Sequence, residues 1–239
     1  MKKLFLSLGI SLNDEQEKKF NRFYELLVEW NKQINLTSIT DYSEVKVKHF
    51  LDSVSVLQYL SNDDLKDKKV IDVGTGAGFP GIPLAIMCPE TSFTLLDTLN
   101  KRITFLNEVI KECNLLNVNT LHGRAEDVAR DMEYREKYDY SVSRAVANLS
   151  VLSEYCIPFI KKDGLFLSYK SVKTDEELLE GKNALNILHS EIERMKKFKL
   201  IDNTLPENVM ERTILFIRKK ELTDMKYPRR AGKPTKKPL

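Results

Sequence analysis

The stretch that decides the fold is Lys69-Val-Ile-Asp-Val-Gly-Thr-Gly-Ala-Gly-Phe-Pro-Gly-Ile82. A β-branched run with one acidic residue leads into three alternating glycines and then into an apolar, helix-like segment. Glycines let the chain turn tightly and bring bare backbone against a ligand, and the helix that follows presents unpaired N–H groups. The stretch therefore predicts a strand, a cofactor-binding loop and a helix.

A second acidic residue supports this interpretation. Asp97 follows the apolar run 92–96 and lies nineteen residues past Gly78. A carboxylate at the end of the second strand of a βαβ unit can accept hydrogen bonds from both hydroxyls of a ribose. We therefore expect Asp97 to bind the cofactor beside Gly74, Gly76 and Gly78.

Two other cofactor classes fit this loop less well. The overlapping register Gly76-x-Gly78-x-x-Gly81 is a formal dinucleotide fingerprint, but Pro80 and Pro83 crowd the turn where a pyrophosphate would approach the helix. A phosphate-binding P-loop needs Lys and then Ser or Thr after the last glycine, and residues 79–81 are Phe-Pro-Gly.

The remaining interpretation is a phosphate-free cofactor. Asp72-x-Gly-x-Gly-x-Gly at one strand end, with Asp97 at the next, is similar to the first two motifs of class I S-adenosylmethionine-dependent methyltransferases. In these enzymes the loop packs against an amino acid and a sulfonium. A glycine turn alone could be only a tight turn, but the strand before it and the carboxylate after it favour a cofactor site.

Charge is concentrated at one end of the chain. The 239 residues are 42% hydrophobic, enough for one large α/β domain with a helical extension. The segment from Lys226 to the end has no acidic residue, while the rest of the chain has 32 basic and 35 acidic residues. Its proline and glycine content predicts an extended tail without a helix, either solvated and disordered or reaching toward a polyanion such as RNA. Its basic residues are Lys226, Arg229, Arg230, Lys233, Lys236 and Lys237.

Several classes of protein are disfavoured. Residues 1–10 superficially resemble a signal peptide, but the apolar run is short and no small-residue cleavage site follows. No segment approaches the roughly 18 apolar residues of a membrane span. Three widely spaced cysteines and three histidines without ligand spacing indicate neither a disulfide framework nor a metal site. We expect a cytoplasmic protein with no metal and no membrane partner.

The order of predicted elements indicates an α/β fold. Residues 13–34 have the spacing of an amphipathic helix capped by Asn13 or Ser11, and a second helical stretch covers about 43–60. Strands and helices then alternate as in a Rossmann-like, seven-stranded, mostly parallel sheet. Strands are expected near 70–73, 93–96, 118–121, 138–142, 164–168, 196–201 and 212–217, and helices near 82–88, 101–113, 149–159 and 175–191. We divide the chain into a helical cap (1–62), a catalytic core (63–220) and a basic tail (221–239).

Segments outside the glycine loop are more distinctive. They are Glu29–Ile39, His49–Ser53, Asp72–Gly81, Asp97–Arg102, Gly123–Glu126, Ser143–Ala147 and Tyr227–Pro234. With these segments the chain resembles, over nearly its whole length, the RsmG (GidB) family of bacterial small-subunit ribosomal RNA methyltransferases. The resemblance implies methyl transfer from S-adenosylmethionine to N7 of one guanosine in 16S ribosomal RNA. It also implies cofactor contacts at Gly74, Phe79, Ala125, Glu126 and Arg144.

This chemistry needs alignment more than proton transfer. Guanine N7 has an exposed lone pair, so it can attack the sulfonium methyl without a general base, and orientation can supply several kcal/mol. We expect Arg144, which follows a strand at the ligand-binding edge of the sheet, and His49 to position the reactants. The helical extension with His49 and Asp52 could fold over the site as a lid. Salt-bridge and helix-surface roles are the alternatives for these residues.

Arg124 and Lys170 also follow predicted strands and are candidates for phosphate or base contacts, with ordinary surface charge as the alternative. We expect a monomer. Two other functions are considered: a nicotinamide-dependent oxidoreductase, which Pro80 and Pro83 disfavour, and a non-catalytic RNA-binding or ribosome-assembly factor. The latter would not need Asp72, the glycines and Asp97 together.

Overall fold

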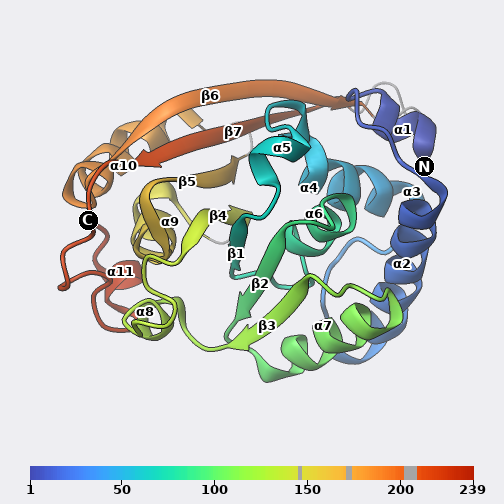
Figure 1. The fold of residues 1–239 in the computed structure, drawn as a ribbon, viewed down its shortest axis with the longest axis horizontal. Helices are drawn as coiled ribbons and strands as arrows, with labels where there is room; N and C mark the ends of the chain where they lie inside the picture. Colours follow the sequence, from blue (N-terminus) through green and yellow to red (C-terminus); the bar gives the residue numbers. More distant parts are fainter. Residues whose placement is uncertain (145–146, 171–173, 202–208) are drawn as a thin grey trace.

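Seven strands form one sheet in the computed structural model of the chain, in the order β3-β2-β1-β4-β5-β7-β6 (Figure 1). The structure describes residues 1–144, 147–170, 174–201 and 209–239, so Ala145 and Val146 of the Ser143–Ala147 segment lie outside it. Neighbouring strands are parallel from β3 to β5, and β7 runs antiparallel to both β5 and β6. The predicted mostly parallel sheet is confirmed. The strands are β1 (Lys69–Val73), β2 (Ser92–Asp97), β3 (Val118–His122), β4 (Tyr138–Arg144), β5 (Ile160–Lys170), β6 (Ser190–Ile201) and β7 (Val209–Lys219).

The strand order reverses at β1. Its neighbours are β2 on one side and β4 on the other, and β1 is buried on both faces because Val70 and Ile71 contribute to different hydrophobic clusters. In open α/β sheets, the crevice at such a reversal lies beyond the carboxyl ends of the strands and binds ligands. This topology places the ends of β1, β2 and β4 around one crevice.

Helices cover both faces of the sheet (Figure 1). On one face α6 (Gly81–Met87) and α7 (Asn100–Glu112) lie under the N-terminal helices, and on the other lie α8 (Ala125–Val128), α9 (Leu149–Cys156), the short 3-10 helix η3 (Ile157–Phe159) and α10 (Thr174–Ile187). The predicted helix 175–191 extends too far. The observed helix ends at Ile187, His189 has a φ of 52°, and β6 begins at Ser190. At the start of α6, a Cβ on Gly81 would collide with the Leu95 and Asp72 side chains. The glycine therefore allows close contact between helix and strands.

The N-terminal extension shares the core of the sheet. Its main helix, α2 (Asp14–Ile34), begins at the predicted cap, where the Asn13 side chain accepts from Gln16 N (2.8 Å) and Asn13 N donates to the Gln16 side chain (3.0 Å). Phe23 of α2 lies 5.3 Å from Phe79 of the glycine loop, measured between ring centroids. The other helices here are α1 (Lys2–Leu6), α3 (Tyr42–Val45), α4 (Asp52–Val54) and α5 (Asn62–Leu65).

The second predicted helix is not one continuous α-helix. Between α3 and α4 the chain forms a π-helix, η1 (Lys46–Leu51), and α4 leads into the 3-10 helix η2 (Ser55–Gln58). The Ser55 hydroxyl donates to Asp52 O, a local bond that competes with regular helix. π-Helical turns often occur at functional positions, and this one contains Lys48 and His49.

The prediction of an extended tail without a helix is wrong. Residues 233–236 form a short helix, α11 (Lys233–Lys236), in which Pro234 is buried. Proline is favoured in a first helical turn because its missing N–H would be unpaired there. The composition argument did not include the tertiary contacts that hold this segment, among them an ion pair between Arg229 and buried Glu154.

Candidate active site

A cavity of about 1120 Å³ opens at the carboxyl ends of β1, β2 and β4. It exceeds the roughly 300–1,000 Å³ of typical small-molecule sites, so it has room for a cofactor and part of a second reactant. Its lining comes from the loop after β1, the ends of β2, β4 and β5, the turn after β3, α9, β6, β7, the N-terminal extension and the tail. Predicted residues that line it are Gly74, Gly76, Phe79, Asp97, Arg124, Ala125, Glu126, His49, Arg144 and Lys170.

The glycine loop forms one wall of the cavity. Gly74, Gly76 and Gly78 have φ values of 72°, 60° and 92°, in the left-handed region that favours glycine. A Cβ on Gly76 would meet nothing within 4 Å and would occupy space at the cavity wall, whereas one on Gly78 would collide with Ile82. Gly78 is therefore needed for packing, and the backbone at Gly74 and Gly76 faces the cavity.

Asp72 stabilises the loop from beneath. Its Oδ2 accepts from Thr75 Oγ1 (2.7 Å) and from Gly81 N (2.8 Å), which joins the start of the loop to the start of α6. The side chain is fully buried, and this burial raises the pKa of Asp72 to about 7. The acidic residue of the motif thus acts on the loop and does not line the cavity.

Asp97 connects the loop to the end of β2. Its Oδ2 accepts from Gly76 N and its Oδ1 from Leu99 N, both at 2.9 Å. Arg102 Nη1 lies 3.2 Å from Oδ2 and 3.5 Å from Oδ1. Each carboxylate oxygen accepts about two hydrogen bonds, so movement of Arg102 would open one acceptor position on each oxygen. Sequence reasoning gave Arg102 no role, although its position five residues after Asp97 in the first turn of a helix was a usable signal.

The turn after β3 brings Glu126 to the cavity. Arg124 is the N-cap residue of α8, and Ala125 and Glu126 are its first residues. The Glu126 side chain is 6% exposed, and its Oε1 accepts from Gly232 N of the tail at 2.9 Å. Sequence reasoning did not predict this contact between the Gly123–Glu126 segment and the C-terminal segment.

Arg144 joins the sheet to the N-terminal extension. Its Nη1 donates to Asp52 Oδ2 (2.9 Å) and to Lys48 O (3.0 Å), and its guanidinium carbon lies 5.1 Å from the centre of the Phe79 ring. Arg212 of β7 approaches the other oxygen of Asp52, with Nε at 3.2 Å from Oδ1. The salt bridge considered for Arg144 is therefore present, and it holds the extension over the cavity. Arg212 was missed because a single arginine in an antiparallel strand forms no motif.

His49 is a neutral ring between two partners. Arg144 Nη2 lies 3.3 Å from Nδ1, and Thr37 Oγ1 lies 2.9 Å from Nε2. Lys48 O lies 3.2 Å from the same Nδ1. Nδ1 therefore accepts from Arg144 in one tautomer of the ring and donates to Lys48 O in the other. Burial, with the nearby Arg144 charge, lowers the pKa of His49 to about 3. The ring stacks on Phe79 at 4.5 Å between centroids.

The predicted cationic residues have different environments. Lys170 is only 9% exposed and its Nζ donates to Ala147 O (3.2 Å), so it is not an ordinary surface lysine. Arg229 is half-buried in its ion pair with Glu154, and Lys226 pairs with Asp224 at 3.0 Å. The other basic residues of the tail are exposed; they are Arg230, Lys233, Lys236 and Lys237.

Across the described ranges, no helix is long and apolar enough to cross a membrane. Within the same ranges, no group of three or more His, Cys, Asp or Glu side chains is arranged to hold a metal ion.

Known proteins match the sequence of this chain over almost its full length. The family model described as GidB, rRNA small subunit methyltransferase G, matches residues 16–206. The chain belongs to this family. It is 49% identical over 236 residues to the ribosomal RNA small subunit methyltransferase G of Lachnoclostridium phytofermentans, covering 98% of this chain and 93% of that protein. It is 48% identical to the protein of the same name from Acetivibrio thermocellus, over 97% and 92% of the two chains. GidB membership confirms the predicted resemblance and the assignment as a methyltransferase that uses S-adenosylmethionine.

Solved structures support the same fold. A 16S rRNA (adenine(1408)-N(1))-methyltransferase from Catenulisporales acidiphilia, with cosubstrate SAM, matches with a TM-score of 0.53 at 14% identity, over 69% of this chain and 94% of that one. TYW2 of P. horikoshii, in complex with MeSAdo, matches with a TM-score of 0.54 at 14% identity, over 75% and 64% of the two chains. At this identity the match concerns the fold alone, and it confirms the predicted class I architecture.

The protonation of His49 gives a testable pH dependence. Its folded pKa of about 3 lies below the ordinary value of 6.5, so below pH 6.5 the unfolded chain binds more protons than the folded one. Stability should fall as the pH decreases from 6.5 toward 3. Between pH 7.5 and 5 the wild-type chain should lose about 1–2 kcal/mol more unfolding free energy than His49→Gln, as measured by urea unfolding. Parallel losses in the two proteins would show that His49 is not held neutral.

Proposed function

We propose that this rRNA methyltransferase transfers the methyl group of S-adenosylmethionine to N7 of a guanosine in small-subunit (16S) ribosomal RNA. The observation that carries the proposal is the composition of the cavity. One half has a glycine loop and a buried carboxylate, and the other has a neutral histidine and an arginine paired with Asp52. Such a site suits N7 methylation because the attacking lone pair requires no deprotonation.

The residues present fit S-adenosylmethionine. Space beside Gly76 that a Cβ would fill can receive the methionine part of the cofactor, and Asp97 lies at the end of the next strand, where ribose hydroxyls would approach. We assign the cofactor contacts to Gly74, Gly76, Gly78, Phe79, Asp97, Ala125, Glu126 and Arg144. Gly78 acts through the shape of the loop, since it does not line the cavity. When bound, the cofactor supplies an electrophilic methyl group on a cationic sulfur.

The second half of the cavity orients the nucleobase. His49 is held neutral and its ring nitrogens are already occupied, so it acts by shape and stacking with Phe79. During transfer, positive charge passes from sulfur to the purine, and an unpaired cation beside the purine would oppose this change. Asp52 pairs with both Arg144 and Arg212 and offsets part of their combined positive charge. Arg144 can therefore position the reactants through hydrogen bonds with less repulsion than an unpaired arginine would cause.

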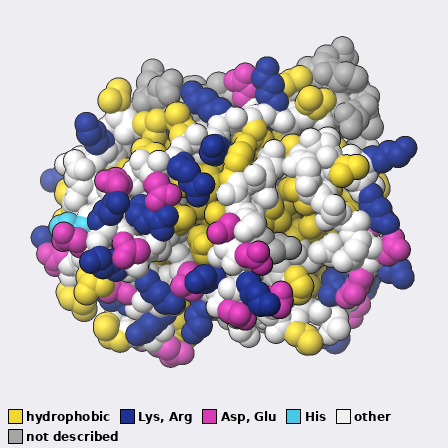
Figure 2. Space-filling view, turned by 45° about the horizontal axis from the view of Figure 1, so that its top comes forward, with side chains coloured by type: hydrophobic (Ala, Val, Ile, Leu, Met, Phe, Trp, Pro, Cys, Tyr) yellow, Lys and Arg dark blue, Asp and Glu magenta, His cyan; other side chains and the backbone are white. Residues whose placement is uncertain are grey.

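RNA contacts are assigned to cations near the cavity and in the tail. Arg124 and Lys170 line the cavity itself. In the tail we assign Lys226, Arg230, Lys233, Lys236 and Lys237, whereas Arg229 serves mainly to attach the segment to Glu154. On the face that carries β6 and β7, basic and acidic side chains are interspersed (Figure 2). The tail is thus the segment best suited to phosphates.

We further infer that the protein acts as a monomer in the cytoplasm, on ribosomal RNA or assembling subunits. One chain supplies every residue assigned above, so the site needs no second copy. The three cysteines are buried thiols, which suits a reducing compartment.

The cofactor assignment is tested by Asp97→Ala. Loss of a carboxylate that accepts from the ribose should weaken S-adenosylmethionine binding by about a hundredfold or more, since each hydrogen bond to a charged group contributes about 1.5–3 kcal/mol. Calorimetric titration measures the change. The matched control is Asp127→Ala, at an exposed position of α8 outside the cavity lining. Equal affinity in the two variants would exclude Asp97 as a cofactor contact.

The reaction is tested by following the methyl group. We expect purified protein and methyl-tritiated S-adenosylmethionine to label small ribosomal subunits, or RNA extracted from them, taken from cells that lack the gene. Nuclease digestion should recover the label as N7-methylguanosine from one position. Label on another atom would overturn the N7 assignment. Cofactor binding without transfer would overturn the proposed substrate.

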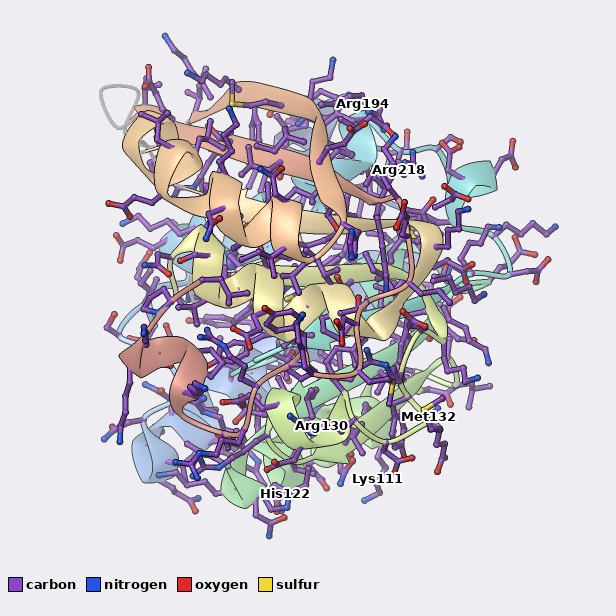
Figure 3. All side chains as sticks on the ribbon, turned by 90° about the vertical axis from the view of Figure 1, so that its left-hand side faces the viewer. Lys111, His122, Arg130, Met132, Arg194 and Arg218 are labelled. Atoms are coloured by element: carbon purple, nitrogen blue, oxygen red, sulfur yellow. The ribbon has the colours of Figure 1, made fainter. Side chains whose placement is uncertain are left out.

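The role of the tail is tested by salt dependence. Replacing Lys233, Lys236 and Lys237 together by Gln should weaken RNA binding and flatten the slope of log affinity against log salt by about 2, because each lost phosphate contact changes it by about 0.7–0.9. The matched control replaces the exposed residues Lys3, Lys111 and Lys162, of which Lys111 is labelled in Figure 3. Equal slopes for the two triple variants would contradict the assignment.

A further inference from the structure

The C-terminal segment is attached to the body by buried charged groups. Arg135 is 2% exposed and donates to Thr223 O (2.7 Å) and Tyr227 O (2.8 Å), while Glu136 accepts from Thr223 N (2.8 Å). Burying a guanidinium without partners is costly, and backbone carbonyls of the C-terminal segment provide partners for this one. The start of the segment is therefore part of the folded structure.

A second attachment lies further along. Glu154 of α9 is fully buried and accepts hydrogen bonds from three nitrogens of Arg229: the backbone N (2.7 Å), Nε (2.9 Å to Oε1 and 3.1 Å to Oε2) and Nη2 (2.6 Å). Arg130, labelled in Figure 3, donates to Pro228 O at 2.7 Å. Removing one partner of such a buried pair leaves an uncompensated charge, so the pairing fixes where the chain passes at residue 229.

Beyond Arg229 the chain reaches the cavity. Gly232 N donates to Glu126 Oε1 (2.9 Å), and the hydroxyls of Tyr155 and Thr235 lie 2.9 Å apart. Gly232 and Thr235 both line the cavity, together with Ala125, Glu126 and Tyr155. Gly232 has a φ of 78°, and a Cβ there would meet nothing within 4 Å. The segment thus supplies one side of the cavity at the turn after β3.

We propose that residues 229–235 form a wall of the S-adenosylmethionine site and contribute to its affinity. This inference rests on the proposed function, and it gives the basic segment a second role besides RNA binding. The turn after β3 adjoins Asp97, the residue assigned to the ribose, because Gly123 N donates to the backbone carbonyl of Asp97. The wall therefore lies at the adenosine end of the cofactor. There Gly232 fixes the orientation of Glu126, and the chain from 229 to 235 limits the access of water.

The test uses S-adenosylhomocysteine and the full-length chain. Gly232→Pro removes the N–H that donates to Glu126 and excludes a φ of 78°, but leaves the Arg229–Glu154 pair in place. Its dissociation constant for S-adenosylhomocysteine, measured by calorimetry, should rise by about tenfold or more. The matched control is Gly232→Ala, which keeps the N–H and has space for its Cβ; we expect a change of less than about threefold, reflecting only the positive φ. Wild-type affinity in Gly232→Pro would overturn the proposal.

A second measurement needs no variant, and it tests the proposed wall even if Gly232→Pro does not fold. Saturating S-adenosylhomocysteine should slow tryptic cleavage after Arg230 in the wild-type chain, relative to cleavage after Lys162. An unchanged ratio of the two cleavage rates would overturn the proposal. If the wild-type chain did not bind S-adenosylhomocysteine at all, the proposed function itself would be refuted. If the wild-type chain bound it but residues 229–235 had no influence on binding, only the proposed wall would be refuted.

Discussion

Two buried carboxylates determine the shape of the loop between β1 and α6, and the rest of the site depends on that shape. Asp72 connects Thr75 to Gly81 from below, and Asp97 holds Gly76 N from the neighbouring strand. Three glycines allow the positive φ values that this path requires. Because both acids lie at ends of adjacent parallel strands, the sheet itself positions the loop against the cavity.

The N-terminal extension completes the site through the two ion pairs of one side chain, Asp52. Asp52 binds Arg144 at the end of β4 and Arg212 in β7, so a single side chain connects the extension with two strands of the sheet. The π-helix that precedes Asp52 presents Lys48 O to Arg144 and places His49 on Phe79. The same contacts that attach the extension thereby close one side of the cavity and keep its histidine neutral.

Features governed by local sequence were predictable. The strand, glycine loop and helix around residues 69–87, and the cap of α2 at Asn13, depend on neighbours a few residues apart, and all were found near their predicted positions. The seven-stranded, mostly parallel sheet followed from the alternation of elements. Arg212 and the π-helix were not predictable, because their roles arise from contacts between distant segments. The tail shows this most clearly: its composition indicates an extended chain, but Arg135, Glu154 and Glu126, which hold it, lie about 75 to 106 residues away in sequence.

The central claim is that the cavity at the ends of β1, β2 and β4 holds the cofactor with its reactive sulfur facing His49 and Arg144. A crystal structure of the full-length chain with S-adenosylhomocysteine tests it most directly. The account predicts that the ribose hydroxyls bond to Asp97, that Arg102 has moved from that carboxylate, and that the sulfur faces the half of the cavity formed by the N-terminal extension. A ligand bound outside this cavity, or one with its sulfur directed away from His49 and Arg144, would contradict the account.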